Sequence, residues 1–164
     1  MTTIKILVLS DSHGDVGTML EIAERERPNE IFHLGDCVRD AESLSYACPG
    51  IPVIMVPGNC DGWTGMSERL LLEREGVRIL LAHGHRWHVK SGVGGALADA
   101  RMCGADILLY GHTHQAVCCT EEDGLRRMNP GTVGGVYAPA TYGVILLEGG
   151  KIFCQIKPVS QDKT

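Results

Sequence analysis

The chain has 164 residues, of which 44% are hydrophobic and 21% are charged, as expected for one globular domain with its own core. Its formal net charge is -5 and its basic residues form no run longer than two, so no basic stripe is available to neutralise a phosphate backbone and a duplex nucleic-acid partner is not expected. No apolar stretch approaches the roughly 20 residues of a membrane span, and the first residues lack a signal-peptide pattern, so we expect a cytoplasmic protein without membrane association.

The first half of the chain predicts strands that alternate with helices. Apolar runs predict strands over residues 4–9, 30–34 and 51–56, and helical spacing predicts helices from Asp15 to a stop at Pro28 and over 40–47. This alternation is typical of βαβ units with parallel neighbouring strands, in which ligands collect at the carboxyl ends of the strands.

The second half is richer in strands. We predict strands over 69–73, 77–82, 107–110, 115–120, 125–128, 142–147 and 151–156, and one short helix over 96–102. Short glycine-containing turns between several of these strands predict hairpins. Because no linker divides the chain, we predict a single domain over residues 1–158, followed by a frayed tail over 159–164.

Side chains that can bind metal follow the predicted strands throughout the chain. They are Asp11, His13, Asp36, Asn59, His83, His85, His112 and His114. Carboxylate, amide and imidazole groups bind divalent ions such as Mn²⁺, Fe²⁺, Co²⁺, Ni²⁺ and Zn²⁺, and seven such residues are enough for two ions that share one carboxylate. Two ions about 3.5–4 Å apart can hold a hydroxide between them and clamp two phosphoryl oxygens. The sequence therefore predicts phosphoester hydrolysis.

Six short motifs follow one another along nearly the whole chain. They are Asp11-Ser12-His13-Gly14, Gly35-Asp36, Gly58-Asn59-Cys60-Asp61, His83-Gly84-His85, Gly111-His112-Thr113-His114 and Asn129-Pro130-Gly131-Thr132. With these motifs the sequence resembles the calcineurin-like metallophosphoesterase superfamily and, within it, the group of small YfcE-like phosphodiesterases. The resemblance implies an α/β fold of two packed mixed β-sheets flanked by helices, with a dinuclear site on one edge and attack by a metal-bridging hydroxide.

The resemblance also implies a role for each motif residue. One ion would be held by Asp11, His13, Asp36 and His114, and the other by Asp36, Asn59, His83 and His112, with Asp36 as the bridge. Asp36, Asn59 and His83 would be catalytic, because they would position the hydroxide and the phosphate. Asp61 is a further catalytic candidate, with turn formation as the alternative.

The sequence departs from the wider superfamily after Asn59. Members of the superfamily often have a His there that stabilises or protonates the leaving group, whereas this chain has Cys60. A neutral thiol is a weaker proton donor than an imidazolium. We therefore expect the enzyme to favour good leaving groups, such as aryl phosphodiesters, over alkyl esters.

Candidate substrate contacts are His85, Arg86 and Cys60. The residues after His85 combine cations with an aromatic ring, so Arg86, His88 and Lys90 are candidates for phosphate and Trp87 for a base or aryl group. For His85, contact with a metal ligand is the alternative to contact with substrate.

The favoured function is a metal-dependent phosphodiesterase acting on a small or nucleotide-like phosphoester. A phosphomonoesterase would need further cations, and Arg39, Arg86 and Lys90 are the ones near the motifs. A non-catalytic protein-interaction scaffold with a retained metal site is the alternative from another class. The complete set of motif histidines disfavours it. Exposed apolar residues in the last hairpins would allow a homo-oligomer.

Overall fold

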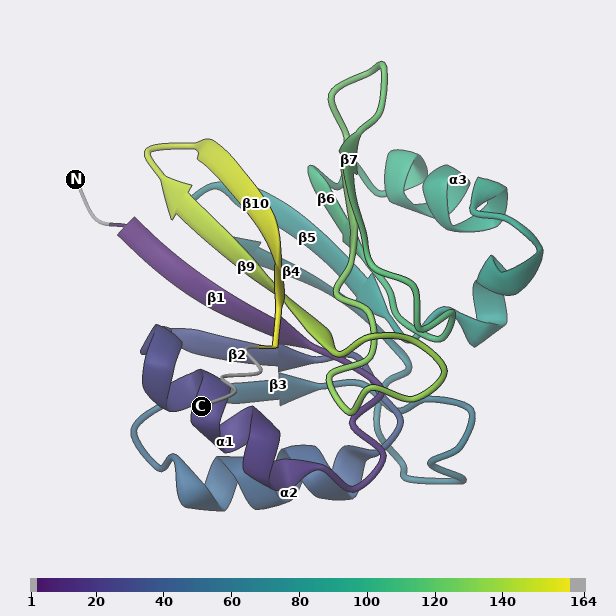
Figure 1. The fold of residues 1–164 in the computed structure, drawn as a ribbon. Coiled ribbons are helices and arrows are strands. Elements are labelled where there is room, and N and C mark those ends of the chain that lie inside the picture. Colours follow the sequence, from purple (N-terminus) through teal and green to yellow (C-terminus); the bar gives the residue numbers. More distant parts are fainter. Residues whose placement is uncertain (1–2, 160–164) are drawn as a thin grey trace.

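The computed structural model describes residues 3–159 as two five-stranded β-sheets packed face to face, with helices on their outer faces (Figure 1). The first sheet has the strand order β10-β9-β1-β2-β3 and the second has the order β4-β5-β6-β8-β7. The elements are β1 (Thr3–Leu9), α1 (Val16–Glu26), β2 (Glu30–His33), α2 (Val38–Ala47), β3 (Val53–Met55), β4 (Arg69–Arg74), β5 (Val77–Ala82), α3 (Gly94–Met102), β6 (Ile107–Leu109), β7 (Val117–Thr120), β8 (Arg126–Asn129), β9 (Thr141–Glu148) and β10 (Lys151–Pro158). Both sheets mix parallel and antiparallel pairs, which confirms the predicted fold class.

The core has three layers because the central strands are buried on both faces. In β1, Ile6 and Val8 pack between the two sheets, whereas Leu7 and Leu9 pack beneath α1 and α2. This alternation follows from the two-residue repeat of a strand. On the other side of the molecule, α3 packs its alanines against β5 and β6.

Most of the predicted elements form, with changes at their ends. Strands β1, β2 and β3 are parallel, as the βαβ pattern predicts. Strand β3 is shorter than predicted, and Pro52, just before it, has no N–H to give to a ladder. The stretch after His83 forms two 3₁₀ turns, His85–Trp87 and Val89–Ser91.

A backbone hydrogen bond fixes the C-terminal end of the described chain. The N–H of Val159, the first residue of the predicted tail, donates to the carbonyl oxygen of Ala140 at 2.9 Å. The rest of that tail lies outside the described residues. Among residues 3–159, no helix combines the length and the apolar character needed to cross a bilayer.

One buried carboxylate ties α1 to the last strands. The side chain of Glu26 is 4% exposed, and it accepts hydrogen bonds from Tyr142 Oη at 2.6 Å and Lys157 Nζ at 3.0 Å. It also pairs with Lys5 Nζ at 2.7 Å. Burial alone would raise the pKa of Glu26, but the hydrogen bonds from Lys5, Tyr142 and Lys157 lower it to about 2.

This network predicts a pH-dependent contribution to stability. A carboxyl whose pKa is lower in the folded state stabilises the fold above its ordinary pKa of 4.5, and this contribution is lost as the pH falls toward 2. We expect Glu26→Gln to lower the free energy of unfolding by about 2 kcal/mol at pH 7 and by much less at pH 2.5. Urea unfolding at both pH values measures this, with Glu24→Gln on the exposed side of the same helix as the control. Equal losses at the two pH values would contradict the prediction.

Candidate metal centre

Asp11 lies directly after β1, and its two carboxylate oxygens have different surroundings. Its Oδ2 accepts hydrogen bonds from Ser10 Oγ at 2.6 Å and from the backbone N–H of His112 at 3.2 Å. Its Oδ1 is buried and has no hydrogen-bond partner. A buried oxygen of an ionised carboxylate is costly without a donor or a cation, so Oδ1 is a candidate ligand atom for a cation.

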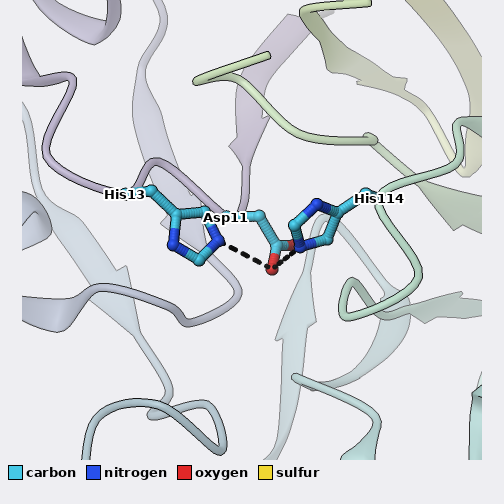
Figure 2. A group of neighbouring side chains, drawn as sticks. All are labelled: Asp11, His13 and His114. Carbon is cyan, nitrogen blue, oxygen red and sulfur yellow. Dashed lines mark ion pairs between the residues drawn. The ribbon is translucent and has the colours of Figure 1, made fainter. Parts of the chain in front are cut away.

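Three imidazole nitrogens face this oxygen. The Nε2 atoms of His13, His83 and His114 lie 3.9, 3.9 and 3.2 Å from Asp11 Oδ1. Figure 2 shows His13 and His114 converging on the carboxylate from two different loops. Groups that come from separate parts of the chain and point at one buried oxygen are arranged as metal ligands are.

The other ring nitrogens of two of these histidines are held by backbone carbonyls. His83 Nδ1 lies 2.8 Å from the carbonyl oxygen of Leu34, and His114 Nδ1 lies 2.7 Å from that of Val136. A carbonyl oxygen only accepts, so each Nδ1 carries a proton, and Nε2 is left as the atom available to a metal. The tautomers therefore fit a metal site.

The second carboxylate is Asp36, at the end of β2. Its Oδ2 lies 3.3 Å from His83 Nε2, and its Oδ1 accepts the backbone N–H of Cys60 at 3.0 Å. Burial opposes it, but Asp36 and Asp11 raise the pKa of His83, so this position favours positive charge.

The ligand atoms fall into two overlapping groups, each with its atoms within 4.8 Å of one another. One group is Asp11, His13 and His114, and the other is Asp11, Asp36 and His83. Asp11 belongs to both groups, whereas the resemblance implies Asp36 as the shared ligand.

The two remaining predicted ligands, His112 and Asn59, lie next to these groups. His112 Nδ1 lies 3.2 Å from His83 Nε2. Asn59 opens onto the same cavity, of about 530 Å³, as His13, Asp36, His112 and His114. All seven predicted ligands thus lie at one edge of the molecule.

The backbone at this edge is strained. Five of the predicted ligands have φ in the left-handed region: Asp11 at 55°, His13 at 44°, Asp36 at 47°, His112 at 72° and His114 at 63°. This region is unfavourable for residues with a Cβ, and such conformations persist where the surrounding structure imposes them, often at functional sites.

Close approach of the backbone to Asp36 requires glycine at position 58. A Cβ atom on Gly58 would overlap Oδ1 of Asp36. We expect Gly58→Ala to displace that carboxylate and to weaken Mn²⁺ binding by about 10- to 100-fold, as for other disruptions of the groups that support metal ligands. Isothermal titration calorimetry with Mn²⁺ measures this. Gly17→Ala in α1, where a Cβ meets nothing within 4 Å, is the control; equal affinities in the two variants would contradict the prediction.

Asp61 holds the loops rather than facing the cavity. Its Oδ2 accepts the backbone N–H groups of Asp36 at 3.0 Å and Gly58 at 2.7 Å, and its Oδ1 accepts that of Val38 at 2.8 Å. This arrangement matches the turn-forming alternative for Asp61. It fixes Asp36 relative to the loop that carries Asn59.

The structure adds a second supporting carboxylate that we did not predict. Asp40 Oδ2 accepts the hydroxyl of Ser12 and the N–H of Gly14, both at 2.7 Å, so it holds the loop on either side of His13. The Ser12 hydroxyl also lies 3.0 Å from Nε2 of His33, whose pKa is lowered by burial to about 4. The only sequence signal was an acidic residue at the start of a helix, and this signal does not indicate that the side chain contacts the loop that carries His13.

The last motif supports the site from the other sheet. The hydroxyl of Thr132 donates to the backbone carbonyl of Asp11 at 2.8 Å. The side-chain amide of Asn129 donates to the carbonyl of Gly111 at 3.2 Å and to Thr113 Oγ1 at 2.8 Å. These contacts connect the loops that carry Asp11 and His112.

The candidate substrate contacts lie in two adjoining cavities. Cys60 is exposed in the cavity over the ligands, and burial together with the Asp36 charge raises the pKa of its thiol. His85 and Arg86 line a second cavity, of about 670 Å³, that shares Asn59 with the first. Trp87 does not face either cavity, because its indole N–H donates to Asp99 at 3.0 Å and its ring packs on the cluster beneath α3.

Two exposed aromatic residues at the cavities were missed by the sequence analysis. Tyr137 is 97% exposed beside His114, with 6.0 Å between the ring centres, and it lines the first cavity. Trp63 is 94% exposed and lines the second. Both lie in glycine-rich loops without periodicity, so the sequence alone gave no direction for their side chains.

Comparison with protein families gives one match over most of the chain. Residues 4–150 match the model of the calcineurin-like phosphoesterase superfamily domain.

Curated relatives and solved structures are also similar over nearly their whole length. The chain is 30% identical to the probable metallophosphoesterase YsnB of Bacillus subtilis, with 88% of this chain and 85% of YsnB covered. It is 30% identical to the phosphodiesterase YfcE of Escherichia coli, with 87% of each chain covered. The crystal structure of a predicted phosphoesterase from Streptococcus pneumoniae superposes with a TM-score of 0.79 at 27% identity, over 97% of this chain and 91% of that one.

Proposed function

The chain belongs to the calcineurin-like phosphoesterase superfamily, and from this we propose that it is a dinuclear metal-dependent phosphodiesterase that hydrolyses a small or nucleotide-like phosphoester. One observation carries the proposal. The buried Oδ1 of Asp11 has no donor and is faced by Nε2 atoms of three histidines, which is a site for a divalent cation.

The proposal gives each ligand a place. Asp11, His13, Asp36 and His114 would hold one ion, and Asp36, Asn59, His83 and His112 the other. Asp11 belongs to both groups of candidate ligands, so its charge would act on both ions. When bound, such a pair of ions lowers the pKa of a water and neutralises phosphoryl charge. The ions would come from the set Mn²⁺, Fe²⁺, Co²⁺, Ni²⁺ and Zn²⁺.

The charges around the cavity favour a diester. Lys90 is the one Lys or Arg side chain among the residues that line the cavity over the ligands. A phosphodiester carries a single negative charge, and one ammonium group beside the ions suits it. A phosphomonoester carries more charge and would need further cations, so the phosphomonoesterase alternative is disfavoured.

Metal-resolved hydrolysis tests the proposal. The purified chain is stripped with chelator, reloaded with each ion in turn and assayed on bis-p-nitrophenyl phosphate and on p-nitrophenyl phosphate, beside His112→Ala. We expect hydrolysis only after reloading, faster on the diester, and its loss in His112→Ala while the circular dichroism spectrum is unchanged. Hydrolysis that survives both chelation and His112→Ala would overturn the proposal.

A further inference from the structure

The second cavity adjoins the candidate metal centre, and among its lining residues Asn59 is the one predicted ligand. It is lined by the loop after β3, including Trp63, and by Glu68, His85 and Arg86. Asn59, a predicted ligand, lies on the boundary and lines both cavities. A phosphoester held at the ligands therefore has room to extend one of its arms into this space.

The cavity offers an aromatic surface. Trp63 is almost fully exposed although it lines a cavity, so its ring is not used to fill the core. An exposed indole face is a stacking surface for another flat ring. The remaining lining of the same loop is small or uncharged, with Pro57, Thr64 and Met66.

The two charged side chains that line the cavity, Glu68 and Arg86, form a salt bridge with each other. Arg86 Nε and Nη2 donate to Glu68 Oε2 at 3.0 Å and Oε1 at 3.2 Å. Glu68 and Arg86 are the only Asp, Glu, Lys or Arg side chains among the lining residues. The guanidinium is thus already paired, and a phosphate group that entered here would meet the carboxylate of Glu68.

One polar atom in the lining has no partner. His85 Nδ1 is buried without a hydrogen bond, and its Nε2 lies 3.6 Å from Glu68 Oε2. A buried ring nitrogen without a partner is unfavourable until a ligand supplies one.

We propose that this cavity is a subsite for one uncharged aromatic arm of a phosphodiester, which stacks on Trp63, and that the Glu68–Arg86 pair excludes a second phosphate group. The proposal rests on the proposed function and extends it, since it names the class of substituent. Aromatic arms of this kind include nitrophenyl groups and nucleobases with their sugars.

Tryptophan fluorescence tests the stacking without any hydrolysis. The chain has two tryptophans, and Trp87 is tied to Asp99. We expect bis-p-nitrophenyl phosphate, titrated into the protein in the presence of chelator, to quench fluorescence in a saturable manner. Trp63→Leu should lose this quenching, whereas Tyr46→Leu, at another exposed aromatic residue, on α2, should keep it. With metal, Trp63→Leu should raise KM for the diester about tenfold and leave kcat nearly unchanged.

The charge pair has its own test. Glu68→Gln frees Arg86, so we expect the ratio of kcat/KM for a p-nitrophenyl phosphodiester whose other arm carries a further phosphate group to that for bis-p-nitrophenyl phosphate to rise about tenfold. Asp123→Asn, which breaks an exposed pair with Arg101, is the control and should leave the ratio unchanged. An unchanged ratio in Glu68→Gln, or saturable quenching that persists in Trp63→Leu, would overturn the subsite. Quenching that depends on Trp63 in a protein without metal-dependent hydrolysis would overturn the proposed function and leave the subsite in place.

Discussion

Replacing Asp11 with Asn is expected to lower metal-dependent diester hydrolysis by at least about 10³-fold. Asp11 belongs to both groups of candidate ligands, and its Oδ1 faces the Nε2 atoms of three histidines, so we expect its charge to act on the whole centre. Metal ions contribute several kcal/mol to transition-state stabilisation, and each 1.36 kcal/mol corresponds to tenfold in rate. The rate is measured on bis-p-nitrophenyl phosphate at saturating Mn²⁺.

The same substitution should not destabilise the fold in the presence of chelator. An amide in place of the carboxylate is nearly isosteric, and its NH₂ group can donate to His114 Nε2, which lies 3.2 Å from Oδ1. We therefore expect a midpoint of thermal unfolding equal to or above that of the unsubstituted chain. Asp106→Asn, which removes the same charge at an exposed position, is the control and should keep full activity. Full hydrolysis in Asp11→Asn would contradict the assignment of Asp11.

The second large effect is expected at Cys60. The thiol is exposed at the cavity over the ligands, beside Asp36, and its raised pKa keeps it neutral. A neutral thiol cannot protonate a departing alkoxide as an imidazolium does, whereas a nitrophenolate departs without protonation. We expect the unsubstituted chain to hydrolyse aryl diesters well and alkyl diesters poorly.

Cys60→His should therefore accelerate alkyl diesters far more than aryl ones. General acid catalysis contributes about 10²–10⁴-fold where a leaving group needs a proton, so we expect a gain of about 10²-fold on an alkyl diester and little change on bis-p-nitrophenyl phosphate. Cys60→Ser, which places another neutral group there, is the matched control and should show neither gain. Equal rates of the unsubstituted chain on aryl and alkyl diesters, with the chemical step limiting, would refute this account.

Two pairs of candidate ligands could be proposed from the sequence alone because their spacing is local. Asp11 with His13, and His112 with His114, stand two residues apart after apolar strands, and the carboxyl ends of such strands meet at one edge of a sheet. The structure brings these four side chains to that edge. The pattern of apolar runs also predicted the parallel order of β1, β2 and β3.

The supporting contacts were not predictable, because they connect residues that are distant in the sequence. Asp40 reaches Ser12 across 28 positions, and Thr132 reaches Asp11 across 121. Neither contact has a periodic or spacing signal. The interpretation of Trp87 as a substrate contact was not supported, because its ring packs on the cluster beneath α3, whereas Trp63, in a loop, lines the second cavity.

Anomalous diffraction from crystals of the chain loaded with Mn²⁺ tests the central claim most directly. The account predicts two Mn²⁺ peaks about 3.5–4 Å apart. Asp11, His13 and His114 should lie at one peak, Asn59, His83 and His112 at the other, and Asp36 within coordination distance of both. A single peak, or none, at a Mn²⁺ concentration that supports full hydrolysis would contradict the dinuclear centre.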